Sequence, residues 1–198
     1  MLPGIKVLGI AGAVAVIGAA AGIYFATAPA RPAASAPAPS SIGGPFTLTD
    51  TSGRTVTDAT LRGKPTAMFF GFTFCPDVCP TTLSDLTSDL QALGSDADRL
   101  NVVFVTVDPE RDTPEQLRRY LSAFDRRIIG LTGTPAQVQA AERAYRVVAS
   151  RQPLPDGGYT MDHTAYVMLF DAQGRFVEPI SLQQAPEQRR AALRRLLG

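Results

Sequence analysis

An uncharged, mostly apolar run of 20 residues, Val7 to Ala26, stands near the N-terminus and separates it from the rest of the chain. At about 1.5 Å per residue, a helix of this length spans roughly 30 Å, the thickness of one bilayer hydrocarbon core. Lys6 precedes the run, and the positive-inside bias keeps such a cation in the cytoplasm, so the rest of the chain is exported. We therefore predict a membrane anchor over residues 1–26, a single span that leaves the body on the periplasmic side of the inner membrane.

A cleaved signal peptide is the alternative, because Ala26-Thr27-Ala28 fits the small-x-small cleavage pattern. The apolar run is longer than a usual signal core, which favours a retained anchor. Residues 27–44 are rich in proline and alanine and have little to bury, so they predict an extended linker. The folded domain is expected over residues 45–198.

Composition excludes several classes of protein. The chain has 19 basic and 18 acidic residues, and a formal net charge of +1 argues against nucleic acid as a partner. Its 2 cysteines exclude a disulfide-dense scaffold, and its 1 histidine excludes a multi-histidine metal site or a conventional zinc finger. A plain disulfide is the default for two cysteines in an oxidising compartment, so a metal or redox role needs further support.

The hydrophobic pattern predicts an α/β domain with a mixed sheet. Continuous apolar runs indicate buried strands, leucines three or four residues apart indicate an amphipathic helix, and a Thr-Pro-x-Gln pattern opens two further helices. The predicted strands are 46–49, 54–57, 66–74, 101–107, 128–131, 165–170 and 175–180. Helices are predicted to begin near Pro80, Thr113, Thr134 and Pro186, and residues 153–164 are expected to form a loop.

The two cysteines lie four residues apart, Cys75 and Cys79, between a predicted strand and a predicted helix. Pro76 and Pro80 interrupt helical structure, so we expect Cys75 to Cys79 to form a loop at the helix N-terminus, where partial positive charge favours thiolates. Three kinds of site are compatible with this pair: an inert disulfide, a redox dithiol and a soft-metal site. Closing so short a loop removes little chain entropy, which disfavours the inert disulfide.

His163 is the single imidazole, 84 residues after Cys79. Two thiolates suit Cu(I), and an added imidazole gives two sulfurs and one nitrogen, a set that also holds Cu(II). Structural zinc prefers four protein ligands, and this chain offers three of the nitrogen or sulfur kind. A lone histidine is commonly a surface or core residue, but its position before a predicted strand of an exported domain makes it a candidate ligand.

Four segments occur in a fixed order: GFTFCPDVCPTTL (71–83), VTVDPERDTP (105–114), DHTAY (162–166) and LFDAQGRF (169–176). Together they resemble the Sco/SenC family of copper chaperones over about residues 45–197. Each motif alone is weak, whereas the ordered set is specific. Many members of that family have histidine where Phe74 stands; the departure touches no ligand, but it leaves this chain without a second imidazole.

The resemblance implies a single thioredoxin-like domain in which Cys75, Cys79 and His163 bind one copper ion, as Cu(I) or Cu(II). It implies delivery of that copper to the CuA site of cytochrome c oxidase subunit II by a metallochaperone that is not an enzyme. The alternative is a thiol-disulfide oxidoreductase in which the two cysteines reduce the apo-CuA site or another exported protein. An upstream periplasmic copper donor and a thioredoxin-like reductant are further expected partners.

Several charged residues have plainer expected roles. Asp77 and Asp162 flank the candidate ligands and either tune the site or are solvated. The acidic and basic residues that precede Thr113 are expected to shape its turn: Asp108, Glu110, Arg111 and Asp112. The basic residues of the last helix are expected to form a solvated face: Arg189, Arg190, Arg194 and Arg195.

Overall fold

The computed structural model describes residues 42–155, 157–181 and 183–198. The predicted anchor, and residues 27–41 of the predicted linker, lie outside the described residues. Within these ranges, no helix has the length and apolar character needed to cross a membrane. The described chain begins at Ile42, whose side chain packs against the core, and the N–H of Gly43 donates to the carbonyl of Ala144 (2.9 Å).

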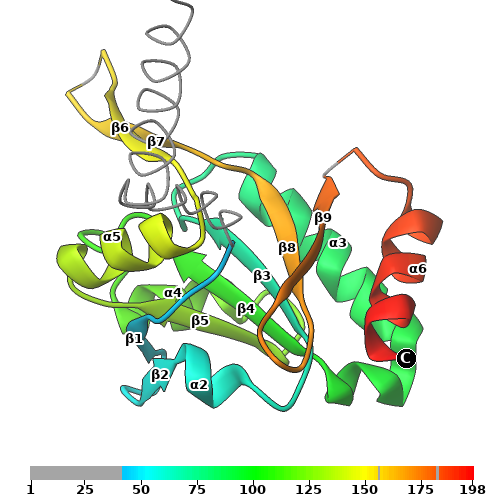
Figure 1. Cartoon of the computed structure of the whole chain (residues 1–198). Coiled ribbons are helices and arrows are strands. Elements are labelled where there is room, and N and C mark those ends of the chain that lie inside the picture. Colours follow the sequence, from blue (N-terminus) through cyan, green and yellow to red (C-terminus); the bar gives the residue numbers. More distant parts are fainter. Residues whose placement is uncertain (1–41, 156, 182) are drawn as a thin grey trace, which may run out of the picture. The chain divides into compact units, whose positions relative to one another are not determined.

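A seven-stranded mixed sheet and a separate two-stranded ribbon form the described domain (Figure 1). The strand order in the sheet is β2-β1-β5-β4-β3-β8-β9, and β3, β4 and β5 run parallel to one another. The remaining pairs of neighbouring strands are antiparallel. The strands of the sheet are β1 (Thr47–Asp50), β2 (Thr55–Thr57), β3 (Thr66–Gly71), β4 (Asn101–Thr106), β5 (Ile128–Thr132), β8 (Tyr166–Phe170) and β9 (Phe176–Ser181). The predicted α/β class with a mixed sheet is confirmed, and the arrangement is thioredoxin-like.

Helices cover both faces of the sheet (Figure 1). They are α2 (Asp58–Leu61), α3 (Val78–Leu93), α4 (Pro114–Leu121), α5 (Pro135–Ala144) and α6 (Pro186–Leu197), with a 3₁₀ segment at Gly94–Arg99. The crossovers from β3 through α3 to β4, and from β4 through α4 to β5, step across the sheet in the same direction. Right-handed crossovers therefore place α3 and α4 on one face. The chain returns through α5 on the other face, and α6 packs beside α3.

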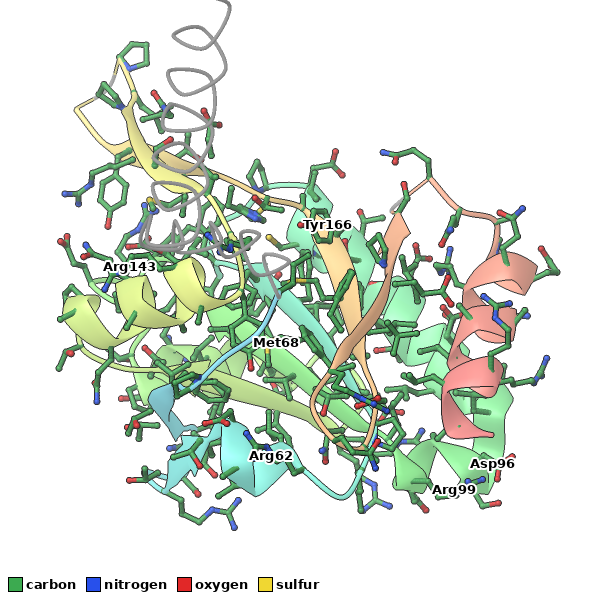
Figure 2. All side chains as sticks on the ribbon, viewed as in Figure 1. Arg62, Met68, Asp96, Arg99, Arg143 and Tyr166 are labelled. Carbon is green, nitrogen blue, oxygen red and sulfur yellow. The ribbon has the colours of Figure 1, made fainter. Side chains whose placement is uncertain are left out.

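The central strands are buried because helices lie on both sides of them. All six residues of β3 are buried, as are five of the six residues of β4. The side chains of Phe69 and Phe104 pack at 6.0 Å between ring centroids, and Met68, labelled in Figure 2, lies in the same interior. This core fixes the carboxyl ends of β3 and β4, from which the candidate site is built.

The two predicted Thr-Pro-x-Gln caps are present, but they differ in one contact. Thr134 and Gln137 form a complete capping box. Thr113 accepts from the backbone N–H of Gln116, whose side-chain amide instead donates to Thr73 Oγ1 (3.2 Å). The start of α4 is thereby linked to the loop that carries the cysteines.

The loop predicted at residues 153–164 is wrong at residue 153 and at residues 159–163, which lie in strands. Strand β6 (Ala149–Pro153) pairs antiparallel with β7 (Tyr159–His163), and His163 is the last residue of β7. Four of the five residues of β6 are exposed, and this strand lacks the alternation of apolar and polar residues that indicates a half-buried strand.

Two further boundaries differ from prediction at the cysteines. Helix α3 begins at Val78, so Cys79 lies in its first turn and not in a loop. Pro80 is tolerated there because the N–H groups of the first turn have no partner within the helix. The strand predicted over residues 66–74 ends at Gly71.

The solvated face predicted for α6 is wrong at Arg189. This side chain is buried, and its guanidinium forms ion pairs with Asp89 (2.9 Å) and Asp85 (3.2 Å) of α3. Arg190 also reaches Asp89 (3.1 Å). The pairing of α6 with α3 joins residues about 100 positions apart in the chain, a proximity that helical periodicity alone does not reveal.

Candidate metal centre

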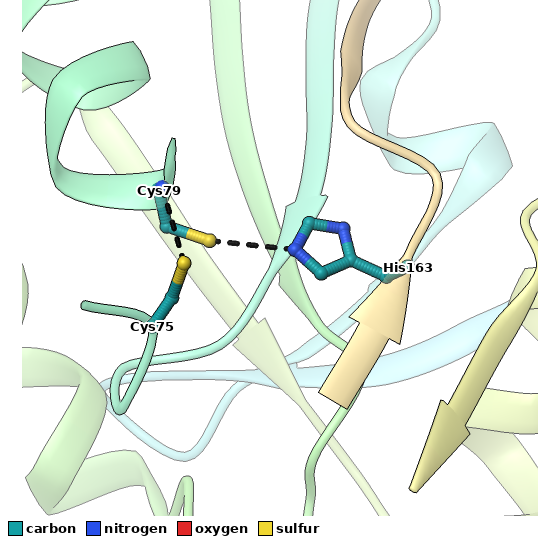
Figure 3. Close-up of side chains that lie close together, drawn as sticks. All are labelled: Cys75, Cys79 and His163. Carbon is teal, nitrogen blue, oxygen red and sulfur yellow. Dashed lines mark hydrogen bonds between the residues drawn. The ribbon is translucent and has the colours of Figure 1, made fainter. Parts of the chain in front are cut away.

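The candidate metal centre lies where two distant segments meet (Figure 3). We call residues 72–80, which run from the end of β3 into the first turn of α3, the cysteine arm. We call the ribbon of β6 and β7 the histidine arm. The first carries Cys75 and Cys79, and the second ends at His163.

The cysteine arm is set by close packing of α3 on β3. Cys79 is fully buried, and a Cβ placed on Gly71 would lie 2.8 Å from its Sγ atom. Glycine at position 71 therefore lets the helix approach the strand. The backbone N–H of Cys79 donates to Cys75 Sγ (3.4 Å), which holds the half-buried Cys75 sulfur at the helix N-terminus.

The histidine arm presents its imidazole in one tautomer. His163 Nδ1 lies 2.9 Å from the carbonyl oxygen of Thr164. A carbonyl only accepts hydrogen bonds, so Nδ1 carries the proton and Nε2 has a free lone pair. Nε2 lies 3.5 Å from Cys79 Sγ. The rings of Phe69 and Phe72 meet the imidazole edge to face, at 6.2 and 5.8 Å between centroids, and fix its orientation.

The ligand atoms of Cys75, Cys79 and His163 all lie within 4.8 Å of one another. Both cysteines are free thiols, with no disulfide between them. Two sulfurs and one imidazole nitrogen form a soft set suited to copper. Structural zinc requires a fourth protein ligand, and the described residues offer no further cysteine or histidine at this point.

The two thiols differ in acidity because they share a hydrogen bond. The side chain of Cys79 lowers the pKa of Cys75 to about 4 against the opposing effect of burial; His163 and nearby backbone N–H groups lower it further. Hydrogen bonding to Cys75, and then burial, raises the pKa of Cys79. The structure therefore favours a thiolate at Cys75 beside a protonated Cys79. A metal ion that takes both sulfurs displaces the Cys79 proton.

A buried carboxylate, Asp112, supports the cysteine arm. It accepts hydrogen bonds from Thr73 N (3.0 Å), Thr73 Oγ1 (2.6 Å) and Thr106 Oγ1 (2.6 Å). Burial raises the pKa of Asp112, while these hydrogen bonds lower it. The sequence assigned Asp112 to the turn before Thr113, and no local signal indicated its contacts with Thr73, which is 39 residues earlier in the chain.

Three other residues near the ligands lie outside the three-residue group. Asp77 is exposed and accepts a long hydrogen bond from Thr81 Oγ1 (3.4 Å), and Asp162 is exposed. The side chain of Phe74, which directly precedes Cys75, is 53% exposed. The guanidinium carbon of Arg111 lies 4.6 Å from the centroid of the Phe74 ring.

A family model described as SCO1/SenC matches residues 34–198 of the chain. The mitochondrial protein SCO2 of Saccharomyces cerevisiae is 41% identical over 143 residues. That match covers 70% of this chain and 47% of the yeast protein, so the chain spans about half the length of this relative.

Solved structures agree with the fold and with the sequence match. The structure of Bradyrhizobium japonicum ScoI with copper bound is 53% identical, with a TM-score of 0.74, and the match covers 78% of this chain and 99% of that one. Arabidopsis thaliana ScoI with copper bound is 34% identical, with a TM-score of 0.74 over 79% of this chain and 98% of that one. Both are solved with copper, the metal to which the two-sulfur, one-nitrogen group is suited.

Proposed function

This chain belongs to the SCO1/SenC family, and from that premise we propose that it is a membrane-tethered copper chaperone. It carries one copper ion on Cys75, Cys79 and His163 and delivers it to the CuA site of cytochrome c oxidase subunit II. The N-terminal anchor holds the domain on the periplasmic side of the inner membrane, where a copper donor and a thioredoxin-like reductant act upstream.

One observation carries this proposal: free thiols and an unprotonated imidazole nitrogen, brought from segments 84 residues apart, lie within 4.8 Å of one another. Copper is the cargo of this site. Thiolates bind Cu(I), and the imidazole extends the set to Cu(II). Because Cys75 is half-buried while Cys79 is fully buried, an acceptor thiolate meets the copper from the Cys75 side and takes it by ligand exchange. A disulfide between the cysteines would remove both sulfur ligands, so loading requires the reduced protein.

The test is an anaerobic transfer from copper-loaded, full-length protein to an apo-CuA domain. We expect one copper per chain before mixing and the CuA absorption bands afterwards. Cys75→Ser and Cys79→Ser each abolish loading, whereas His163→Ala weakens Cu(II) binding and alters the thiolate-to-copper absorption. Tight copper binding that persists in all three variants would show that copper binds elsewhere.

A second function is supported by the same pair of thiols. A half-exposed Cys75 of low pKa beside Cys79 has the arrangement of a dithiol reductant. In that role, Cys75 thiolate attacks a target disulfide, Cys79 resolves the mixed disulfide, and two electrons leave the dithiol as the target gains two thiols.

His163 separates the two functions. If the protein acts as a reductant, His163→Ala still restores oxidase assembly in cells that lack the wild-type protein, whereas either cysteine-to-serine variant fails. If it acts by carrying Cu(II), all three variants fail. The assembled oxidase is measured by its CuA absorption and by its activity in isolated membranes.

A further inference from the structure

We propose that Arg111 is a positioning residue that ties the cysteine arm to the histidine arm and so sets where His163 stands relative to the cysteines. The inference deepens the proposed copper function and rests on it for its purpose. Arg111 lies on neither arm. It belongs to the segment between β4 and α4, where the sequence predicted only a turn.

On the histidine arm, Arg111 holds the first residue of β7. Its Nη1 donates to the carbonyl oxygen of Tyr159 (2.9 Å), and its guanidinium carbon lies 3.7 Å from the centroid of the Tyr159 ring. The Tyr159 hydroxyl donates to Asp108 Oδ1 (2.9 Å), and Arg111 Nε donates to Asp108 Oδ2. Arg111, Tyr159 and the buried Asp108 carboxylate thus contact one another in all three pairs, at the start of β7.

On the cysteine arm, the same guanidinium faces two aromatic rings. Its central carbon lies 4.6 Å from the centroid of Phe74 and 5.9 Å from that of Phe72. Phe74 directly precedes Cys75, and Phe72 packs edge to face on the imidazole of His163. Stacking on a cation explains why a phenylalanine that is 53% exposed stands beside the site.

Hydrogen bonding alone does not explain the position of the guanidinium. Arg111 Nη2 is buried and has no hydrogen-bond partner among the described residues. A buried donor without a partner is costly, so the stacking contacts must favour this placement. These contacts reach Tyr159 on one arm and Phe74 on the other, and no shorter side chain at position 111 would span both.

The histidine arm needs such a support because no residue of β6 or β7 is buried, and of its hydrophobic side chains the half-buried Ala149 and Met161 pack against the core. Four of the five residues of β6 are exposed. A second bridge from the ribbon to the segment after β4, Arg151 with Glu110 (3.0 Å), has side chains that are 52% and 59% exposed. An exposed pair contributes little, whereas Arg111 is paired with a carboxylate that is 4% exposed. Because Arg151 also lies over the Tyr159 ring (3.5 Å to the centroid), the matched control is Glu110→Gln, which removes the exposed bridge and leaves this stack in place.

The proposal predicts unequal effects on the two oxidation states of copper. Without Arg111, the ribbon samples positions in which Nε2 of His163 is displaced from the sulfurs. Cu(II), which uses the imidazole, is then held less tightly. Cu(I), held by the two thiolates, is not affected, because the backbone contacts of the cysteine arm remain.

The experiment compares Arg111→Met, Arg111→Lys, Tyr159→Phe and Glu110→Gln in the full chain. For Arg111→Met we expect Cu(II) affinity to fall about tenfold, with weaker nitrogen coupling in the Cu(II) paramagnetic resonance spectrum and unchanged Cu(I) affinity. Without copper, amide hydrogen exchange rises at residues 159–163 and not in β3 or β4. Tyr159→Phe, which retains the stacked ring, and Arg111→Lys, which retains the charge, give intermediate effects. Glu110→Gln, which removes only the exposed bridge to Arg151, matches the wild type.

Two results would overturn the proposal. One is an Arg111→Met protein whose ribbon exchange and Cu(II) spectrum match those of Glu110→Gln. The other is an equal loss of Cu(I) and Cu(II) binding with faster exchange throughout the sheet, which is the signature of general destabilisation. If the wild-type protein binds no copper, the proposed function fails, while exchange at residues 159–163 without metal still decides whether Arg111 holds the ribbon.

Discussion

The two arms of the metal centre are built differently. Cys79 stands in the first turn of a 16-residue helix that packs on the central strand, and it is fully buried. His163 ends a ribbon whose strand β6 is largely exposed. The ribbon is held by polar and aromatic contacts and by the half-buried Ala149 and Met161, which pack against the core. The sulfur ligands are therefore positioned by the core, and the nitrogen ligand by local contacts.

Under the proposed function, this difference suits a protein that must both hold and release copper. The core positions Cys79 without copper, and the backbone N–H of Cys79 holds Cys75 beside it. The imidazole is expected to move at the least cost, because no residue of β6 or β7 is buried, whereas moving Cys79 would disturb the packing of α3 on β3. Changes to the cysteine arm should consequently affect stability and copper together, while changes to the histidine arm should affect them separately.

The largest effect on stability is expected at the contact between α3 and β3. In Gly71→Ala, the added Cβ would lie 2.8 Å from both Cys79 Sγ and a ring carbon of Phe104, so both buried groups must shift. We expect a loss of about 3 kcal/mol in the free energy of unfolding, together with weaker Cu(I) binding. Urea denaturation and copper titration measure the two effects.

Gly44→Ala is the control for this substitution, because its nearest contact is Ala144 Cβ at 3.4 Å. It should leave stability and copper binding nearly unchanged. Wild-type behaviour of Gly71→Ala would contradict the claim that the core positions the cysteine arm.

The pH dependence of Cys75 alkylation is a second test of how the cysteine arm differs from the histidine arm. With a pKa of about 4, Cys75 is a thiolate at pH 6 and at pH 8, so its alkylation by iodoacetamide should proceed at nearly the same rate at both. An ordinary thiol would react about a hundredfold faster at the higher pH. Mass spectrometry of the alkylated peptide gives the rate.

Because Cys79 is the largest cause of the low pKa of Cys75 and His163 a smaller one, substitutions should rank in the same order. Cys79→Ala should slow the reaction at pH 6 more than His163→Ala does. The reverse order would mean that the histidine arm, and not the core, controls the thiolate.

Asp112→Ala removes the acceptor beneath the cysteine arm. The N–H and hydroxyl of Thr73 and the hydroxyl of Thr106 then lose their partner, and we expect a loss of about 2 kcal/mol in the free energy of unfolding. Asp112→Asn retains an acceptor oxygen and should cost less. Equal losses in the two variants, measured by urea denaturation, would show that the negative charge matters more than the hydrogen bonds.

The smallest effect on stability is expected at Glu142 of α5, beside the histidine arm. Its carboxyl lines a cavity of about 240 Å³ together with Tyr159 and Met161 of the ribbon. Burial raises the pKa of Glu142 from 4.5 to about 7. The folded protein thus binds a proton that the unfolded chain releases, and the resulting stability is present below pH 4.5 and lost as pH rises through about 7.

Glu142→Gln should abolish that dependence. Between pH 5 and pH 8, the free energy of unfolding of the wild type should fall by about 1 kcal/mol more than that of the variant. Solvent screening of this half-exposed group limits the difference. The urea midpoint at the two pH values measures the difference. Parallel pH profiles for the two proteins would show that Glu142 titrates normally.

Much of the fold was predictable because its signals are local. Buried strands such as β3 and β4 are continuous apolar runs. Thr113 and Thr134 are N-cap residues, and each predicts the start of the helix that follows it. The ribbon of β6 and β7 was missed because none of its residues is buried and β6 has no apolar period. The buried position of Arg189 was missed because its partner Asp89 is 100 residues away in the chain.

For the site, the sequence by itself determined which atoms are available: two sulfurs four residues apart at a helix N-terminus, and one imidazole. Only the tertiary structure decided that the imidazole reaches the sulfurs, that its Nε2 is the free nitrogen, and that Arg111 and Asp112 support the two arms. The physical reason is that ligand identity is a property of single residues, whereas distance, tautomer and burial arise when segments 84 residues apart pack against one core.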